Sequence, residues 1–278
     1  MKKILSLLLI ILVKTAFCQT EQLKSRSPRE TIGETYFVFA APNAKIYGSL
    51  TDEKDEFIKV NDHKNLKLKL MKIDETNGTQ IAHFIDSAGN KYNRGLFEGC
   101  FPYMVPQKDF EEARKIYSGK TVWINPSIVP ATAGDARIEE TKVERFKKYT
   151  VTTVSLYKNN DEPIKLTLTP ESGPALTIAA SLTGTNVSYM EKAWLLPKLL
   201  FLQDPKTLYN FTPQTWANIK KDYLVPGMDK DAVRLILGNP ESINNSSNTG
   251  KYATDQWVYP YEYVYFEGGK YKSRNSKN

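Results

Sequence analysis

One cysteine and two histidines have side chains suited to covalent catalysis. Cys100 lies in the stretch GLFEGCFP, and His63 and His83 are the only histidines of the 278 residues. A cysteine beside a histidine base can attack an acyl carbon, which would make the chain a hydrolase. His83, however, alternates with Ile81 and Ile85 on a mostly apolar strand face. We therefore predict a packed, hydrogen-bonded His83, a buried structural Cys100 and no catalytic residue.

Four acidic residues close together raise the question of a metal site: Asp52, Glu53, Asp55 and Glu56. Their spacing lacks the alternating oxygen ligands and the central glycine of a calcium-binding loop. We interpret the segment as a solvated loop, and we predict neither a metal nor another cofactor.

Five aromatic residues near the C-terminus form the candidate binding surface: Trp257, Tyr259, Tyr261, Tyr263 and Tyr265. Strand alternation places the last three on one side and Val264 and Phe266 on the other. Aromatic pairs across strands stabilise a sheet by about 0.2–1 kcal/mol each, which is the structural alternative for this set. If helices cover one face of the sheet, the tyrosines on the other face, with Lys251, Lys270 and Lys272 nearby, make a contact site for a partner or for lipid head groups.

The elements that must position this set are predicted between residues 212 and 274. Thr212-Pro213 begins one helix. Asp229 suits the N-cap of a second helix, which Gly238 ends and Pro240 prevents from continuing. Strands are expected over residues 256–259 and 262–266, and Gly268-Gly269 suits a hairpin turn into a third strand.

The order of these signals resembles the domain of small outer-membrane lipoproteins of the SmpA/OmlA (BamE-like) group. The matching positions are Gly227, Met228, Leu237, Gly238, Pro240, Trp257, Tyr259, Phe266 and Gly268. The resemblance covers roughly the last quarter of the chain. It implies a non-enzymatic unit of two helices on a three-stranded antiparallel sheet, which acts in envelope protein assembly by contacting partner proteins and lipid head groups.

Residues 35–190 are predicted to be rich in short strands. Leu66, Leu68 and Leu70 alternate with lysines, as in a half-buried strand, and Asn77-Gly78 is a strong hairpin signal. This close succession of short strands and turns is similar to that of bacterial Src-homology-3-like (SH3-like) modules. Residues 35–190 would form one such unit or two. A helix over residues 107–117 with Asp109 as its cap interrupts the strands. An apolar stretch over residues 190–202 predicts a helix broken at Pro197.

The N-terminus has the features of a signal peptide. Lys2-Lys3 precede an apolar stretch from Ile4 to Val13, and a cleavage site fits at Cys18. Ordinary cleavage and lipid attachment at Cys18 are both open. The stretch is too short to span a bilayer, so we expect no transmembrane segment in the mature chain. Removal of residues 1–18, with their three lysines, lowers the net charge from +7 to +4, and nucleic acid is not expected as a partner.

Together these observations predict an α+β protein in five parts. They are a signal peptide (1–18), a flexible lead-in (19–34), the SH3-like β-rich region (35–190), a helical connector (191–211) and the BamE-like domain (212–274). The predicted function is protein binding, or binding to a membrane or cell-wall surface, by a non-enzymatic cell-envelope protein. It would be exported, either to the periplasm or outer membrane or as a secreted protein, and would act in outer-membrane assembly or maintenance. The alternative is a cell-wall-associated enzyme, or its regulatory subunit, that uses the β-rich region.

Overall fold

The computed structural model describes residues 24–39, 50–54, 56–58, 66–101, 103–134, 136–159, 161–188, 194–245 and 254–277. The predicted signal peptide with Cys18, and also His63, Asp55 and Lys251, lie outside these residues. The described residues form two compact units. The first takes its residues from Met1–Val122, Val129–Thr141 and Lys148–Leu200, and the second from Trp123–Ile128, Lys142–Lys147 and Phe201–Asn278.

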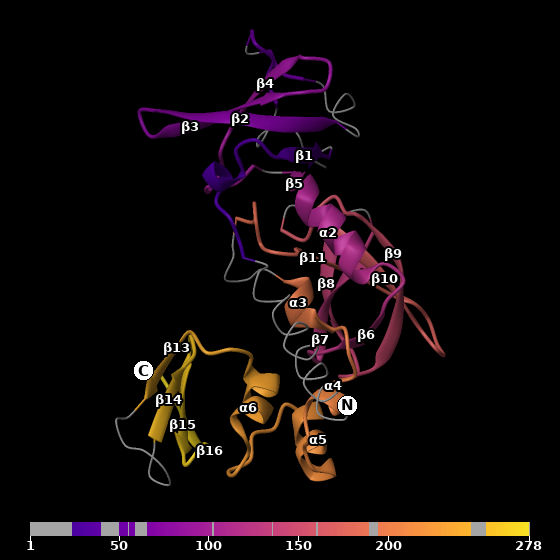
Figure 1. The fold of residues 1–278 in the computed structure, drawn as a ribbon, viewed down its shortest axis with the longest axis vertical. Helices are drawn as coiled ribbons and strands as arrows, with labels where there is room; N and C mark the ends of the chain where they lie inside the picture. Colours follow the sequence, from indigo (N-terminus) through magenta and orange to yellow (C-terminus); the bar gives the residue numbers. More distant parts are fainter. Residues whose placement is uncertain are drawn as a thin grey trace, which may run out of the picture. The chain divides into compact units, whose positions relative to one another are not determined.

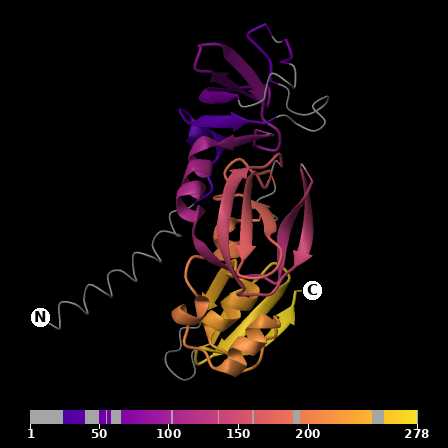
Figure 2. The same ribbon diagram turned by 90° about the vertical axis from the view of Figure 1, so that its right-hand side faces the viewer.

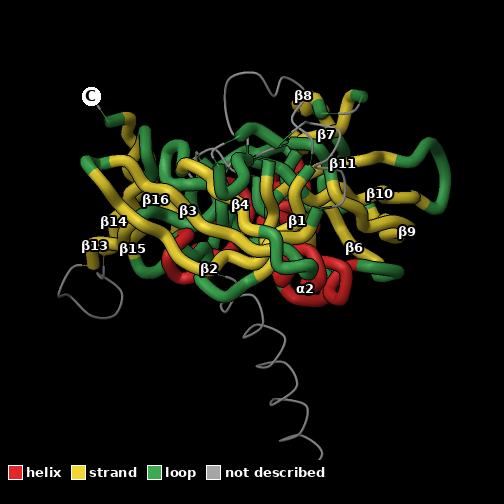
Figure 3. Tube along the Cα trace, turned by 90° about the horizontal axis from the view of Figure 1, so that it is seen from above, coloured by secondary structure: helices red, strands yellow, loops and turns green. Residues whose placement is uncertain are grey.

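The first unit contains a five-stranded antiparallel sheet in the order β4-β3-β2-β1-β5. Its strands are β1 (Thr35–Val38), β2 (Lys67–Thr76), β3 (Thr79–Ile85), β4 (Lys91–Gly95) and β5 (Met104–Pro106). Asn77 and Gly78 join β2 to β3 with φ angles of 52° and 76°, the left-handed pair that a two-residue hairpin requires. Leu68 and Leu70 are buried while Lys67 and Lys69 are exposed, which confirms the predicted alternation. Figure 3 shows this sheet beside the helix α2 (Gln107–Tyr117).

A second sheet has seven strands in the order β12-β6-β9-β10-β11-β7-β8. They are β6 (Thr121–Ile124), β7 (Ile128–Ala133), β8 (Arg137–Lys142), β9 (Lys148–Leu156), β10 (Ile164–Pro170), β11 (Leu176–Ala180) and β12 (Leu200–Phe201). Figure 2 shows its long central strands in pink. Ile164, Leu166 and Leu168 alternate along β10 and are fully buried, so one face of this sheet forms a core.

Two predicted helices of this region differ from the structure. The cap of α2 is Pro106, and Asp109 lies inside the first turn, where its carboxylate binds side chains instead of helix N–H groups. The broken helix expected over residues 190–202 is, in the described part of this range (194–202), a single turn, α3 (Leu196–Leu199), with Pro197 inside it. Proline is tolerated in the first turn of a helix and not in its interior, so Pro197 lies at the start of α3. The chain after α3 pairs as β12.

Two further short elements are the 3₁₀ helix η1 (Pro28–Thr31) and α4 (Pro205–Leu208).

The second unit joins two short helices to a four-stranded antiparallel sheet (Figure 1). The elements are α5 (Pro213–Lys220), α6 (Lys230–Leu237), β13 (Ser242–Asn245), β14 (Thr254–Val258), β15 (Glu262–Glu267) and β16 (Lys270–Ser276). Thr212 caps α5 by accepting the Thr215 N–H at 3.1 Å. Ala232 and Val233 of α6 share one buried cluster with Trp257, Val264 and Phe266.

The predicted α+β class is wrong. Of the residues that the structure describes, 44% lie in strands and 18% in helices, in three antiparallel sheets, so the fold is mostly β. The C-terminal region is built on the sheet β13–β16 and not as two helices on a three-stranded sheet. The additional strand is β13, whose residues Ser242–Asn245 are exposed, and the two asparagines among them have low strand propensity. They form a strand because they pair with the edge of β14.

A buried arginine holds the second unit together. Arg145 is 3% exposed. Its guanidinium donates to the backbone oxygens of Asn125 (2.5 Å), Ile219 (2.7 Å) and Leu235 (2.5 Å), and it pairs with Asp222 Oδ1 at 2.5 Å. Ile219 and Leu235 belong to the last turns of α5 and α6, where carbonyls have no partner within the helix. The Ile219 oxygen also accepts the Asp222 N–H at 3.1 Å. One arginine side chain therefore contacts both helix ends and ties them to residues 142–147.

We expect Arg145→Met to lower the free energy of unfolding of the second unit by about 3–5 kcal/mol, because it removes one donor each of the Leu235, Asn125 and Ile219 carbonyls, and the ion pair with Asp222. Denaturant titration followed by tryptophan fluorescence reports on this unit, which contains Trp123, Trp216 and Trp257. The control Glu144→Gln removes one partner of the surface ion pair between Glu144 and Lys220, whose side chains are 65% and 40% exposed, and should cost about 1 kcal/mol or less. Equal losses in the two variants would contradict the proposed role of the carbonyl contacts.

Candidate functional site

The structure divides the predicted aromatic surface in two. Trp257 and Tyr259 face the core and are buried. The Trp257 ring lies 4.5 Å from the Phe266 ring, and the Tyr259 hydroxyl donates to the Gly238 oxygen at 3.0 Å, which ties the end of β14 to the end of α6. These two residues are therefore structural.

Tyr263 and Tyr265 lie on the opposite side of β15. The buried Val264 and Phe266 alternate with them, as predicted. Both tyrosines are partly exposed and lie outside the core cluster of this unit. Tyr261 is 85% exposed in the turn before β15. The structure thus leaves three of the five predicted residues accessible to a partner.

The strand register defines the surface to which Tyr263 and Tyr265 belong, which we call the outer face. Residues paired directly across an antiparallel sheet point to the same side. The outer face therefore comprises Ser242, Asn244, Gln256, Val258, Tyr263, Tyr265, Ser273 and Asn275.

A line of polar contacts crosses the outer face from strand to strand. Asn244 Nδ2 donates to Gln256 Oε1 at 2.8 Å, and Gln256 Nε2 donates to the Tyr265 hydroxyl oxygen at 3.1 Å. Lys277 Nζ lies 5.2 Å from the centre of the Tyr263 ring, a distance at which the cation and the ring attract each other. These contacts hold the tyrosines in fixed positions.

The lysines expected beside the tyrosines have other partners. Lys270 Nζ lies 2.5 Å from Asp229 Oδ1, and Lys272 Nζ lies 2.6 Å from Glu267 Oε2. Asp229 occupies the predicted N-cap of α6, yet its side chain makes no bond to the helix backbone. These ion pairs reduce the positive charge that is free to meet a ligand.

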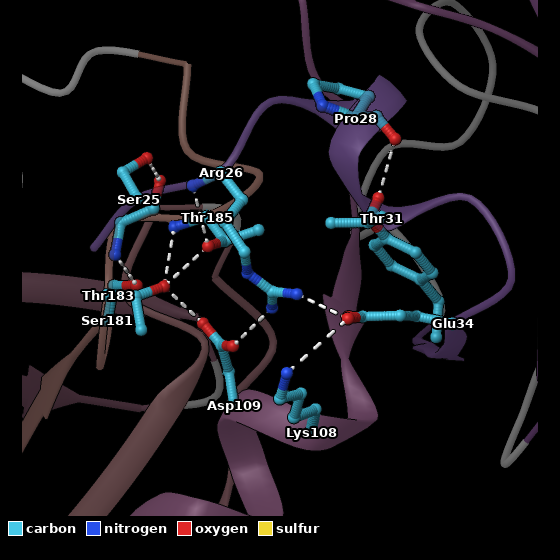
Figure 4. A network of polar contacts seen from close by, with 12 residues as sticks. Ser25, Arg26, Pro28, Thr31, Glu34, Lys108, Asp109, Ser181, Thr183 and Thr185 are labelled. Atoms are coloured by element: carbon cyan, nitrogen blue, oxygen red, sulfur yellow. Dashed lines mark hydrogen bonds and ion pairs between the residues drawn. The ribbon is translucent and has the colours of Figure 1, made fainter. Parts of the chain in front are cut away.

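A polar network in the first unit joins the segment before β1 to α2 (Figure 4). Arg26 bridges Glu34 and Asp109, with 3.0 Å from Nη2 to Asp109 Oδ1. The Thr183 hydroxyl also donates to Asp109, and the Arg26 N–H donates to Thr185 Oγ1 at 3.2 Å.

Asp109 is the buried carboxylate of this network. Burial raises its pKa, while the bonds from Thr183 and Arg26 oppose that shift. Because both Asp109 oxygens accept bonds from protein groups, the network anchors residues 25–34, part of the predicted flexible lead-in. The sequence does not reveal this network, because the position of Asp109 predicts a helix cap.

The residues proposed for covalent chemistry are placed differently from a catalytic pair. Cys100 is 1% exposed, and its thiol donates to the Phe97 oxygen at 3.1 Å. His83 Nε2 lies 3.0 Å from Asp74 Oδ2 on the surface of the β2–β3 hairpin. His83 is therefore hydrogen-bonded, as predicted, but partly exposed and not packed in the core.

The acidic segment is organised as a loop. Asp52 Oδ1 accepts the N–H groups of Lys54 (2.8 Å) and Glu56 (3.0 Å), and Glu53 pairs with Lys91. Among the residues that the structure describes, no cluster of three potential metal ligands occurs.

Glu162, in the loop between β9 and β10, is an unusual titratable group that the sequence patterns do not single out. Burial, and next the charge of Asp161, raise the pKa of Glu162 from 4.5 to about 7. Asn159 Oδ1 accepts the N–H groups of Asp161 and Glu162, and this turn holds the two carboxyl groups side by side.

The described helices include none with the length and apolar character needed to cross a membrane. Comparisons with family models, curated proteins and solved structures find no match. The resemblances to BamE-like and SH3-like domains therefore stay predictions that rest on the residues named above.

We expect Cys100 to be inert in the native protein. Iodoacetamide should modify it at least a hundredfold faster in denaturant than in buffer, because the buried thiol reacts only when the chain opens. Mass spectrometry of peptides containing residue 100 measures this. Fast native modification would instead support the cysteine-enzyme alternative.

Glu162 should make stability depend on pH. The pKa of Glu162 is raised in the folded state. Its favourable contribution to the free energy of unfolding is therefore complete below about pH 4.5 and is lost as the pH rises through about 7. Glu162→Gln should flatten this dependence and raise the free energy of unfolding above pH 7 by about 1–2 kcal/mol, after allowance for solvent screening.

Urea titrations between pH 4.5 and 8 measure the Glu162 effect. Glu171→Gln removes an exposed carboxylate of the same unit and serves as the matched control. An unchanged pH dependence in Glu162→Gln would show that Glu162 is not its source.

Proposed function

We propose that this chain is an exported, non-enzymatic protein of the cell envelope that binds a partner protein or an envelope surface through the outer face of its C-terminal sheet. The observation that carries the proposal is the sorting of aromatic residues on β14 and β15. Trp257 and Phe266 fill the core, whereas Tyr263 and Tyr265 remain partly exposed on the other side.

The chemistry of the outer face supports binding. Tyrosine offers a large ring and a hydroxyl at little cost in conformational entropy, and it is enriched where interfaces have high binding energy. Gln256 donates to the Tyr265 hydroxyl from the neighbouring strand and is itself held by Asn244, which lowers the cost of ordering Tyr265 when a partner binds. A suitable partner would cover the rings with apolar area and match the amide and hydroxyl groups with hydrogen bonds.

Envelope constituents are proposed as partners because of the predicted signal peptide and the resemblance of the C-terminal quarter to BamE-like lipoproteins. A role in outer-membrane assembly or maintenance belongs to the same proposal. The enzyme alternative lacks support of this kind, since Cys100 is buried and its thiol binds a backbone oxygen.

The double variant Tyr263→Ser/Tyr265→Ser should bind at least tenfold more weakly, because loss of interface tyrosines commonly costs 1–2 kcal/mol or more. Binding is measured by co-sedimentation of the mature protein with peptidoglycan sacculi and, separately, with outer-membrane vesicles that retain their proteins. The control is Tyr223→Ser, at a tyrosine of the same unit that is exposed and belongs to no strand.

The two sediments distinguish a cell-wall surface from a membrane or membrane-protein partner. Equal binding by the wild type and the double variant, or no binding of the wild type to either material, would contradict the proposal.

A further inference from the structure

One arginine of the first unit has a buried guanidinium. Arg94 lies on β4 opposite Ala82 of β3 and is 2% exposed. Ala82 belongs to the core cluster under this sheet, so the Arg94 side chain enters the core side.

Two donors of Arg94 make no hydrogen bond to the part of the chain that the structure describes. They are Nε and Nη2. These two N–H groups lie on the same edge of the guanidinium and point in parallel, at the spacing that matches two oxygens of a carboxylate or a phosphate. The unpartnered pair is therefore the bidentate edge of the side chain.

The positive charge of the Arg94 guanidinium is not balanced by the ionisable groups that interact with it. Burial lowers the pKa of Arg94 to about 10, so the side chain remains protonated at pH 7. The ionisable groups that interact with it are those of Cys100 and Tyr103, which are ordinarily neutral at this pH. Cys100 also uses its proton to bond the Phe97 oxygen. Burial of an unbalanced cation is strongly unfavourable, and an anion that binds it recovers much of that cost.

We propose that Arg94 forms a binding site for a small oxyanion, a carboxylate or a phosphate, held by Nε–H and Nη2–H. The low exposure of Arg94 favours a small molecule over a macromolecular surface, which could not reach the guanidinium. Because Arg94 is 2% exposed, entry requires local opening of the chain around its side chain. This site belongs to the first unit and is independent of the function proposed for the outer face.

The test follows the arginine Nε–H signals of the full mature chain by ¹H–¹⁵N NMR. Sodium acetate and inorganic phosphate are titrated separately, against sodium chloride at equal ionic strength. We expect one of the two anions to shift the signal that is absent from the Arg94→Met spectrum, and this identifies the ligand class. At 100 times its dissociation constant, that anion should also raise the midpoint of thermal unfolding by about 5–10 °C.

Two further variants complete the experiment. Arg94→Lys keeps the charge but lacks the paired donors, so it should bind the anion at least tenfold more weakly. Arg137→Met removes an arginine whose side chain is 76% exposed, and it should respond as the wild type does. Failure of both anions to shift any arginine Nε–H signal of the wild type would overturn the proposal, and this outcome does not depend on whether the variants fold. An equal thermal response in Arg94→Met and the wild type would overturn it as well.

Discussion

The buried guanidinium of Arg145 is the interaction on which the second unit depends. The last carbonyls of α5 and α6 need donors, and Arg145 supplies them to Ile219 and Leu235 from a segment 74 and 90 residues earlier in the chain. With the ends of both helices held, α6 buries Ala232 and Val233 against Trp257 and Val264. That packing determines which side of the sheet becomes the core.

The outer face follows from this choice of core. On β15 alternate side chains point in opposite directions, so burial of Val264 and Phe266 directs Tyr263 and Tyr265 outward. A single stretch of aromatic sequence thus supplies both structural and candidate binding residues. Arg26 and Asp109 in the first unit are similar to Arg145, because they join segments 83 residues apart. In both units, arginine contacts join segments that are distant in sequence, from the partly exposed Arg26 in the first unit and from the buried Arg145 in the second.

Local patterns predicted the features that depend on near neighbours in the chain. The alternation of Leu68 and Leu70, the Asn77-Gly78 turn and the sorting of Val264 from Tyr265 follow from strand geometry alone. The roles of Asp109 and Arg145 could not be found in this way, because their partners are distant in sequence. The role proposed for Arg94 depends on the burial of its side chain, which the fold determines. The strand β13 was missed because asparagine has low strand propensity, and it forms through pairing with the consecutive strand β14.

Site-specific photo-crosslinking in the cells that produce the protein tests the binding role of the outer face most directly. A photoreactive phenylalanine analogue is placed at Tyr265 in one strain and at Tyr223 in another, and products are separated by mass after irradiation. The account predicts a discrete crosslinked product in the envelope fraction from position 265 and none from position 223. No product from position 265, or the same product from both positions, would contradict it.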